Sequence, residues 1–161
     1  MMTIFIISFV IFALYIIGLM IIEGVPHSFS DGFYILNEKK RGLGYLFTLW
    51  CFAVALSVMP IMFELSAEKW FQFLGLFTGG GLGFVGAAPL FKSHEKTIHY
   101  TSAVICAISG FAWMALSGYW YVPVVALIAV LYPAFKDKKW TFWGELALFL
   151  SMYTTLLLML I

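Results

Sequence analysis

The sequence has 161 residues, of which 63% are hydrophobic and only 11% are charged. A soluble domain usually has about 45–50% apolar and about 25% charged residues, so this composition excludes a water-soluble globular protein. The net charge of +1 provides no basic field, and we expect no nucleic-acid partner. Six membrane-spanning helices of about 20 residues each would use most of the chain. We therefore expect a single transmembrane domain over residues 1–161.

Apolar runs in the sequence predict six membrane-spanning helices joined by short polar loops. The first run lacks a basic n-region and is followed by no small-residue cleavage site, so it reads as a retained helix rather than a signal peptide. A polar connection, roughly 23–43, follows it. The fifth expected helix is the shortest, with Pro123 and Pro133 near its ends. The six helices are expected at roughly 3–22, 44–63, 70–91, 97–117, 122–135 and 140–160.

The distribution of basic residues predicts how the helices are oriented. Eight of the nine Lys and Arg residues fall in the first, third and fifth loops, and the second loop contains only Lys69. Short loops rich in Lys and Arg stay in the cytoplasm. We therefore expect an all-α, six-helix bundle with both termini outside, in a bacterial inner (plasma) membrane.

The first polar segment with a chemical pattern is 26–34. His27 and Asp31 are four residues apart, so on a helical turn they would share a face as metal ligands or as an acid–base pair. Ser28 or Ser30 could then be oriented by them. The alternative is a solvated loop in which Ser30 or Asp31 caps a short interfacial helix.

The second polar segment is 92–100. The zinc-protease pattern His-Glu-x-x-His needs histidines four residues apart, whereas His94 and His99 are five apart, so that pattern is absent. Glu95 and His99 are four apart and could share a ligand face. The alternative is an interfacial His99 that hydrogen-bonds a neighbouring loop, with His94 in solvent.

Glu145 lies about one turn inside the last expected helix. An ionised carboxylate facing lipid at that depth costs a few kcal/mol or more. We expect Glu145 to face the bundle, paired with a histidine or a tyrosine hydroxyl, either as a structural interhelical contact or in metal or proton handling. We also expect Glu145 and the three histidines to converge on the cytoplasmic side.

Small residues recur every four positions in the third expected helix, at Gly75, Gly79 and Gly83. Such a stripe lets another helix approach closely, and we expect it to pack against a helix rather than lipid. It also defines a face through which the chain could form a homo-oligomer. Cys51 and Cys106 both fall within expected spans, where we interpret them as small packing residues.

Three stretches, 26–34, 84–91 and 98–103, resemble small bacterial membrane proteins in order and placement. Those proteins are distantly similar to the CREST-like superfamily, which includes alkaline ceramidases and progestin/adipoQ receptors. Its enzymes are seven-helix amidases with a metal held by histidines and an aspartate near a serine. The resemblance therefore implies Ser30, Asp31 and His99 as site residues. This chain departs from the pattern because its last helix has Glu145 where the superfamily has a histidine pair.

Three function classes remain open from the sequence, and whether the chain is an enzyme is one of the open points. One is a metal-assisted hydrolase acting on a membrane lipid or amide from the cytoplasmic side. Its metal, a divalent ion such as zinc, would be held by His27, Asp31, Glu95 and His99, and its catalytic residues would be Ser30, Asp31 and Glu145. The second is a small transporter or channel lined by Glu145 and the glycine-rich helix. The third is a non-catalytic membrane partner or scaffold.

Overall fold

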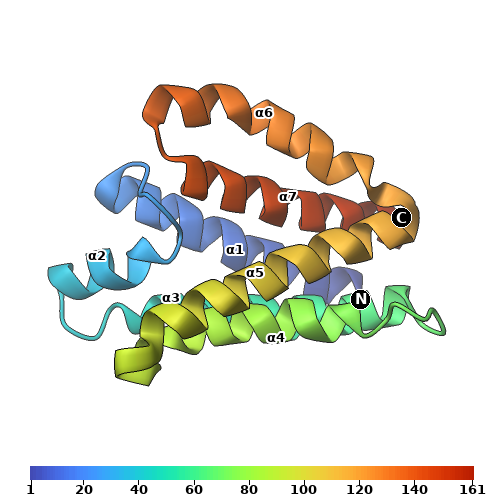
Figure 1. The fold of residues 1–161 in the computed structure, drawn as a ribbon, viewed down its shortest axis with the longest axis horizontal. Helices are drawn as coiled ribbons and strands as arrows, with labels where there is room; N and C mark the ends of the chain where they lie inside the picture. The colour runs from blue at the N-terminus through green and yellow to red at the C-terminus, as the bar shows by residue number, and fades with distance from the viewer.

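The protein is described by a computed structural model that covers the backbone of residues 1–161 and every side chain except that of Lys92. The described residues form helices and no β-strand, so the all-α prediction is confirmed. A 3₁₀ helix, η1, follows α4, and a π-helical turn, η2, follows α5 (Figure 1). In chain order the elements are α1 (Met2–Glu23), α2 (Asp31–Lys39), α3 (Tyr45–Leu65), α4 (Leu74–Ala87), η1 (Ala88–His94), α5 (Glu95–Met114), η2 (Ala115–Tyr119), α6 (Tyr121–Asp137) and α7 (Trp140–Leu160).

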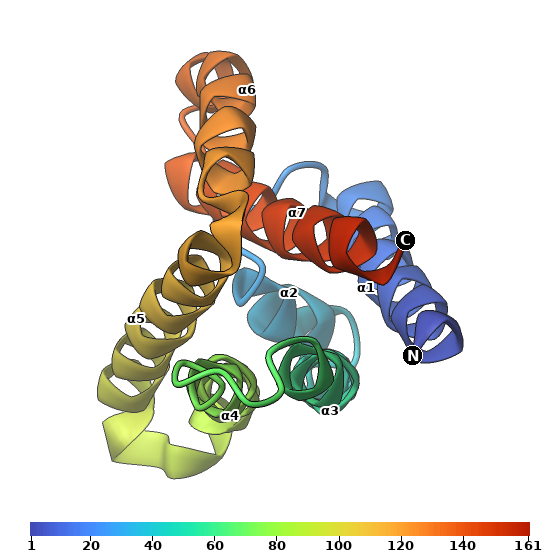
Figure 2. The ribbon, with the colours of Figure 1, turned by 90° about the vertical axis from the view of Figure 1, so that its right-hand side faces the viewer.

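Five helical segments are long and apolar enough to cross a membrane: α1, α3, α4 continued into η1, α5 continued into η2, and α7. The helix α6 has 17 residues and falls just short of this length, so the six-span count is not confirmed. It packs along α7, on the side of α7 that faces away from α3 and α4 (Figures 1 and 2).

The outward faces of these helices are apolar. On α1, Leu14 is 67% exposed and Ile21 is 79% exposed, and on α3 Leu56 is 64% exposed. Contiguous apolar surface on this scale is unfavourable in water and is expected where lipid is the solvent. The fold is therefore that of a multi-pass helical membrane protein.

The third expected helix is shorter than predicted at both ends. The sequence indicated a helix over about 70–91, whereas α4 covers only Leu74–Ala87. Turns such as the one in which Lys69 N–H donates to the Ser66 carbonyl occupy the preceding residues. At the other end, Pro89 has no N–H to donate to an α-helical bond, and the chain continues as the 3₁₀ helix η1.

The glycine stripe of α4 packs against α3, which confirms that it faces a helix. A Cβ atom added at Gly79 would lie 2.8 Å from the Met59 Cβ, and one at Gly75 would lie 3.2 Å from the Met62 Cβ. The small residues thus allow the two backbones to approach closely. Within this chain α3 covers Gly75, Gly79 and Gly83. A homo-oligomer stays a prediction.

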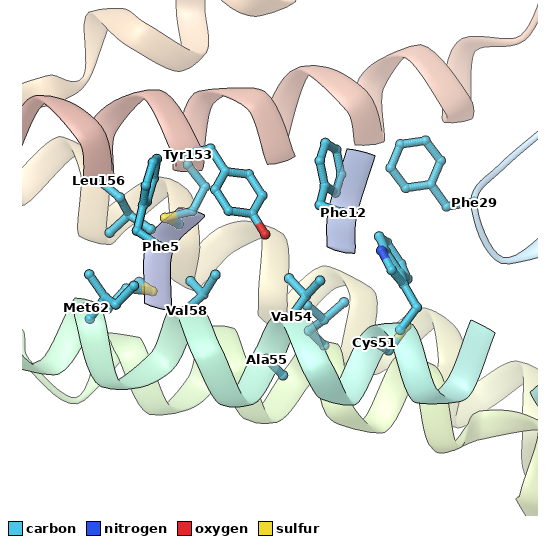
Figure 3. Close-up of a cluster of buried hydrophobic side chains, with 14 of the residues drawn as sticks. Phe5, Phe12, Phe29, Cys51, Val54, Ala55, Val58, Met62, Tyr153 and Leu156 are labelled. Carbon is cyan, nitrogen blue, oxygen red and sulfur yellow. The ribbon is translucent and has the colours of Figure 1, made fainter. Parts of the chain in front are cut away.

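The core is centred on α1, α3 and α7, and Leu82 of α4 and Trp113 of α5 extend it. Its largest members are aromatic, and Figure 3 shows Tyr153 of α7 between Phe5 and Phe12 of α1. The Tyr153 ring lies 5.9 Å from the Phe5 ring and 5.2 Å from the Phe12 ring, measured between centroids. Phe29, which lies outside the long helices, joins the same cluster.

The loops with many basic residues lie at one end of the bundle, which we call the basic end. Figure 1 places the end of α1, the helix α2, the start of α5 and the α6–α7 turn together there. Both termini and the connection between α3 and α4 lie at the opposite end. This arrangement fits alternating helix directions and places the three histidines near the basic end.

Candidate functional site

The segment between α1 and α2 is held against the start of α7 by three hydrogen bonds. Lys139 Nζ donates to the Val25 carbonyl at 2.8 Å, and Phe142 N–H donates to the His27 carbonyl at 2.9 Å. Phe29 N–H donates to the Glu145 carboxylate at 2.7 Å. The first N–H groups of a helix have no partner within it, so the His27 carbonyl satisfies one of the free donors of α7. We call residues 25–30 the strap.

A reciprocal pair of hydrogen bonds starts α2 at the end of the strap. Ser28 N–H donates to Asp31 Oδ2 at 3.0 Å, and Asp31 N–H donates to Ser28 Oγ at 3.2 Å. This arrangement is a capping box in which an aspartate takes the place of the usual glutamate or glutamine. Asp31 therefore caps the start of α2, as in the alternative interpretation of this segment as a capped interfacial helix. The serine that pairs with it is Ser28.

The position of α2 depends on a close approach at its second residue. A Cβ atom added at Gly32 would collide with the Tyr15 hydroxyl of α1. The same hydroxyl donates to the Phe29 carbonyl at 3.4 Å. Only glycine permits this contact, which brings α2 and the strap over the basic end of the bundle.

A cavity of about 130 Å³ lies inside the bundle below the strap. Its walls come from α3, α4, α5 and α7, and most of the lining is apolar. The cavity is not filled from the α5 side, because the residues on that face of α5 are small: Ala103, Cys106, Ala107 and Gly110. The cavity is half open, and α5 and α7 contact each other only sparsely. Phe111, which lines it from α5, is 39% exposed, so we place the opening between α5 and α7.

The strap end of the cavity contains the carboxyl group of Glu145, and no other described lining residue has a carboxyl group. Ser30 lines the same cavity, and its hydroxyl lies 2.9 Å from the Ser28 hydroxyl. Asp31 lies outside the lining but within electrostatic reach of Glu145. Of the predicted catalytic residues, the structure thus brings Ser30 and Glu145 to one cavity and places Asp31 beside it.

Aromatic rings surround the strap end. The Phe29 ring lies 6.0 Å from the Trp50 ring, edge to face, and 5.7 Å from the Phe149 ring. Trp50 also lies 6.0 Å from Phe47 in a stacked arrangement. All four residues line the cavity. The carboxylate therefore lies beside an aromatic wall.

The opposite end of the cavity has hydroxyl groups that are already paired within the bundle. The Tyr153 hydroxyl lies 2.8 Å from Ser8 Oγ, and Ser57 Oγ donates to Ser8 Oγ at 2.7 Å. Thr78 Oγ1 lies 3.0 Å from Ser109 Oγ. These bonds tie α1 to α3 and α7, and α4 to α5. They satisfy buried polar groups rather than extend a polar path from Glu145.

The four expected metal ligands do not form a cluster. Among the described residues, no three His, Cys, Asp or Glu side chains are arranged to hold a metal ion. His27 and Asp31 border a separate polar recess of about 370 Å³ beside α2, whose lining does not include Glu95 or His99. Glu95 and His99 lie one turn apart on α5, where His99 is within electrostatic reach of both Glu95 and Asp31.

Several lining residues were not singled out from the sequence. Ala103, Ala107 and Gly110 of α5 line the cavity. Their spacing marks a face of small residues, and such a face serves equally for close packing or for a hollow. Phe29 could not be identified as a lining residue from the sequence, because a single aromatic residue in a loop is common.

Fold and cavity together define a class: a multi-pass helical membrane protein with an apolar intramembrane cavity that ends at a carboxylate. Comparison with protein-family models, with curated proteins and with solved structures finds no match to this chain. The resemblance to the CREST-like superfamily stays a prediction.

Proposed function

We propose that this protein binds a membrane amphiphile, with the apolar tail in the cavity and the polar head beside Glu145 and Ser30. The observation that carries the proposal is the cavity itself, which is apolar along its length and has one carboxyl group at its strap end. Binding sites for small molecules are commonly apolar with a few well-placed polar groups that fix the orientation of the ligand.

The dimensions of the cavity suit part of an alkyl chain. Its volume of about 130 Å³ is close to the roughly 150 Å³ of an engineered apolar cavity that binds benzene. The lining residues on α3 run from Phe47 to Val58, which is about 16 Å along the helix axis at roughly 1.5 Å per residue. A narrow, elongated space of this kind fits an extended hydrocarbon better than a compact solute.

The position of the opening supports entry from the bilayer. An amphiphile could move its tail sideways between α5 and α7 while its head stays near the strap. We infer that the basic end faces the cytoplasm, because short loops with Lys and Arg stay there. We also infer that α6 is a sixth span, since it runs along α7 and exposes apolar side chains such as Val125 and Ile128. The ligand would then come from the inner leaflet of a bacterial plasma membrane.

The other function classes receive less support from the geometry. Ion transport needs polar groups that continue from Glu145 across the bundle, whereas the cavity walls beyond it are mainly aliphatic and aromatic. Metal-assisted hydrolysis would use Ser30, Asp31 and Glu145, but the described residues gather no set of metal ligands near them. Binding is therefore the function that these contacts support best.

Photolabelling with a matched pair of variants tests the proposal. The protein in nanodiscs is labelled with a fatty-chain probe that carries a diazirine at the end of the chain. Ala107→Phe fills the cavity, whereas Ile108→Phe adds the same ring at a neighbouring position that is 65% exposed to the outside. We expect labelled peptides from the cavity faces of α3 and α7, a strong loss of that labelling in Ala107→Phe and little change in Ile108→Phe. Labelling confined to the outer faces, or equal in both variants, contradicts the proposal.

A further inference from the structure

We propose that the amphiphile bound in this cavity has a cationic head, an ammonium group, and that this group pairs with the Glu145 carboxylate. The inference rests on the proposed function, because it names the chemical class of the ligand for the same cavity. It follows from the hydrogen bonding of Glu145, from the charges around it and from the aromatic wall.

Only one of the two Glu145 oxygens has a partner in the described part of the chain. Oε2 accepts the hydrogen bond from Phe29 N–H at 2.7 Å. No described side chain or backbone group donates to Oε1, and the residue lines the cavity. A ligand with a hydrogen-bond donor on its head can reach this second oxygen without breaking the bond to the strap.

No cationic side chain among the described residues forms an ion pair with Glu145. The ion pair found in that part of the chain joins Lys39 and Glu23, and the charged group of α2 that faces Glu145 is the carboxyl of Asp31. Lys139, the residue that precedes α7, donates to the Val25 carbonyl. An ionised carboxylate in apolar surroundings is costly unless a cation is close to it. An ammonium head would provide the missing counter-charge.

The aromatic wall favours the same ligand. Phe29, Phe47, Trp50 and Phe149 line the cavity at the end where Glu145 lies. Ammonium groups bind over aromatic faces, and Trp provides the strongest such attraction. A carboxylate or phosphate head would instead meet the Glu145 carboxyl group, and like charges at short range disfavour such a ligand.

A set of three probes with the same tail tests the charge of the head. Dodecylammonium, dodecanol and dodecanoate compete with the fatty-chain photoprobe for labelling of the cavity in zwitterionic phosphatidylcholine nanodiscs. Competition at the outer helix faces corrects for partitioning of each probe into the bilayer. We expect the ammonium to compete at a concentration at least about tenfold lower than dodecanol, which corresponds to about 1.4 kcal/mol. Dodecanoate should compete least.

Glu145→Gln assigns the effect to the carboxylate. Glutamine retains an oxygen that can accept from Phe29 N–H, so the strap keeps its contact while the charge is removed. In this variant the ammonium should lose its advantage while dodecanol competes as before. Asp31→Asn, which removes a neighbouring carboxylate outside the lining, should retain most of the preference.

The outcomes separate this inference from the proposed function. If dodecanol competes as well as the ammonium in the unaltered protein, the cationic head is wrong, and if the preference persists in Glu145→Gln, the pairing with Glu145 is wrong. In both cases the cavity still binds tails. If none of the three probes reduces labelling of the cavity, the proposed function itself fails. The comparison of heads in the unaltered protein needs no variant, so it stands even where Glu145→Gln does not fold.

Discussion

The Glu145 carboxylate on α7 accepts a hydrogen bond from the Phe29 backbone N–H, 2.7 Å away and 116 positions apart in sequence. This bond fixes the strap over the cavity and at the same time orients the only carboxylate in the lining. One residue thus connects the stability of the basic end to the proposed ligand site. The two roles can be separated because they depend on different properties of the side chain, an acceptor oxygen and a negative charge.

Glu145→Leu should destabilise the protein, whereas Glu145→Gln should not do so to a comparable extent. Leucine leaves the Phe29 N–H without an acceptor, which costs about 1–3 kcal/mol for a buried group. Thermal unfolding of both variants in detergent, followed by circular dichroism, measures the difference. Equal melting temperatures for Leu, Gln and the unaltered protein would show that the bond to the strap contributes nothing.

The glycine stripe of α4 predicts a second pair of variants with opposite outcomes. A Cβ at Gly79 would lie 2.8 Å from the Met59 Cβ, whereas a Cβ at Gly80 meets nothing within 4 Å. Gly79→Leu should therefore overpack the contact with α3 at a cost of about 1–3 kcal/mol. Gly80→Leu, the same change one position later, is the control and should be tolerated. A similar melting temperature for the two variants would mean that α3 and α4 do not pack as described.

Most of the helical architecture could be predicted from the sequence, because apolar runs of membrane length leave little alternative. The boundaries of α1, α3 and α7 lie within about two residues of the prediction, which is the usual uncertainty of a helix end. The shortening of α4 was harder to predict, since three of the four residues before it, Trp70, Phe71 and Phe73, are aromatic and extend the apolar run. The helix α2 appeared only as an alternative, because it has only nine residues and lies within the polar connection after the first apolar run.

The candidate site was only partly predictable. Glu145 stood out because a carboxylate inside an apolar helix needs a partner, but its partner proved to be the backbone of Phe29 rather than a histidine or tyrosine. A backbone donor leaves no mark in the sequence. The cavity was not predicted at all, since it depends on how α7 is placed relative to α3, α4 and α5 (Figure 2).

Tyr153→Phe should weaken the contact between α1 and α7. Its hydroxyl lies 2.8 Å from Ser8 Oγ and 3.2 Å from the Ser8 carbonyl oxygen. A hydrogen bond between membrane helices contributes about 0.6 kcal/mol on average and up to about 1.7. Tyr132→Phe, at a position that is 76% exposed, removes a hydroxyl outside the core and is the matched control. A melting temperature lowered equally by both changes would contradict a specific role for the buried hydroxyl.

The membrane topology underlies the proposed direction of ligand entry and can be tested by cysteine labelling. In a background that lacks Cys51 and Cys106, single cysteines replace Asn37, Lys138, Glu68 and Trp120, all of which are exposed. Asn37 and Lys138 lie at the basic end, and Glu68 and Trp120 belong to the segments that follow α3 and η2. We expect an impermeant maleimide to label Glu68→Cys and Trp120→Cys in intact cells. Asn37→Cys and Lys138→Cys should react only after the membrane is permeabilised.

Labelling at position 138 decides whether α6 crosses the membrane. If α6 crosses the bilayer, Trp120 and Lys138 lie on opposite sides, although the 17 residues of α6 extend only about 26 Å at roughly 1.5 Å per residue. Hydrocarbon of about 30 Å then requires local thinning or the contribution of η2 to the span. Labelling of Lys138→Cys from outside, with Asn37→Cys protected, would show that α6 does not cross and that α6 and α7 must be placed differently. Labelling of both Asn37→Cys and Lys138→Cys from outside, with Glu68→Cys protected, would instead invert the bundle. Glu145 and the strap would then receive amphiphiles from the outer leaflet.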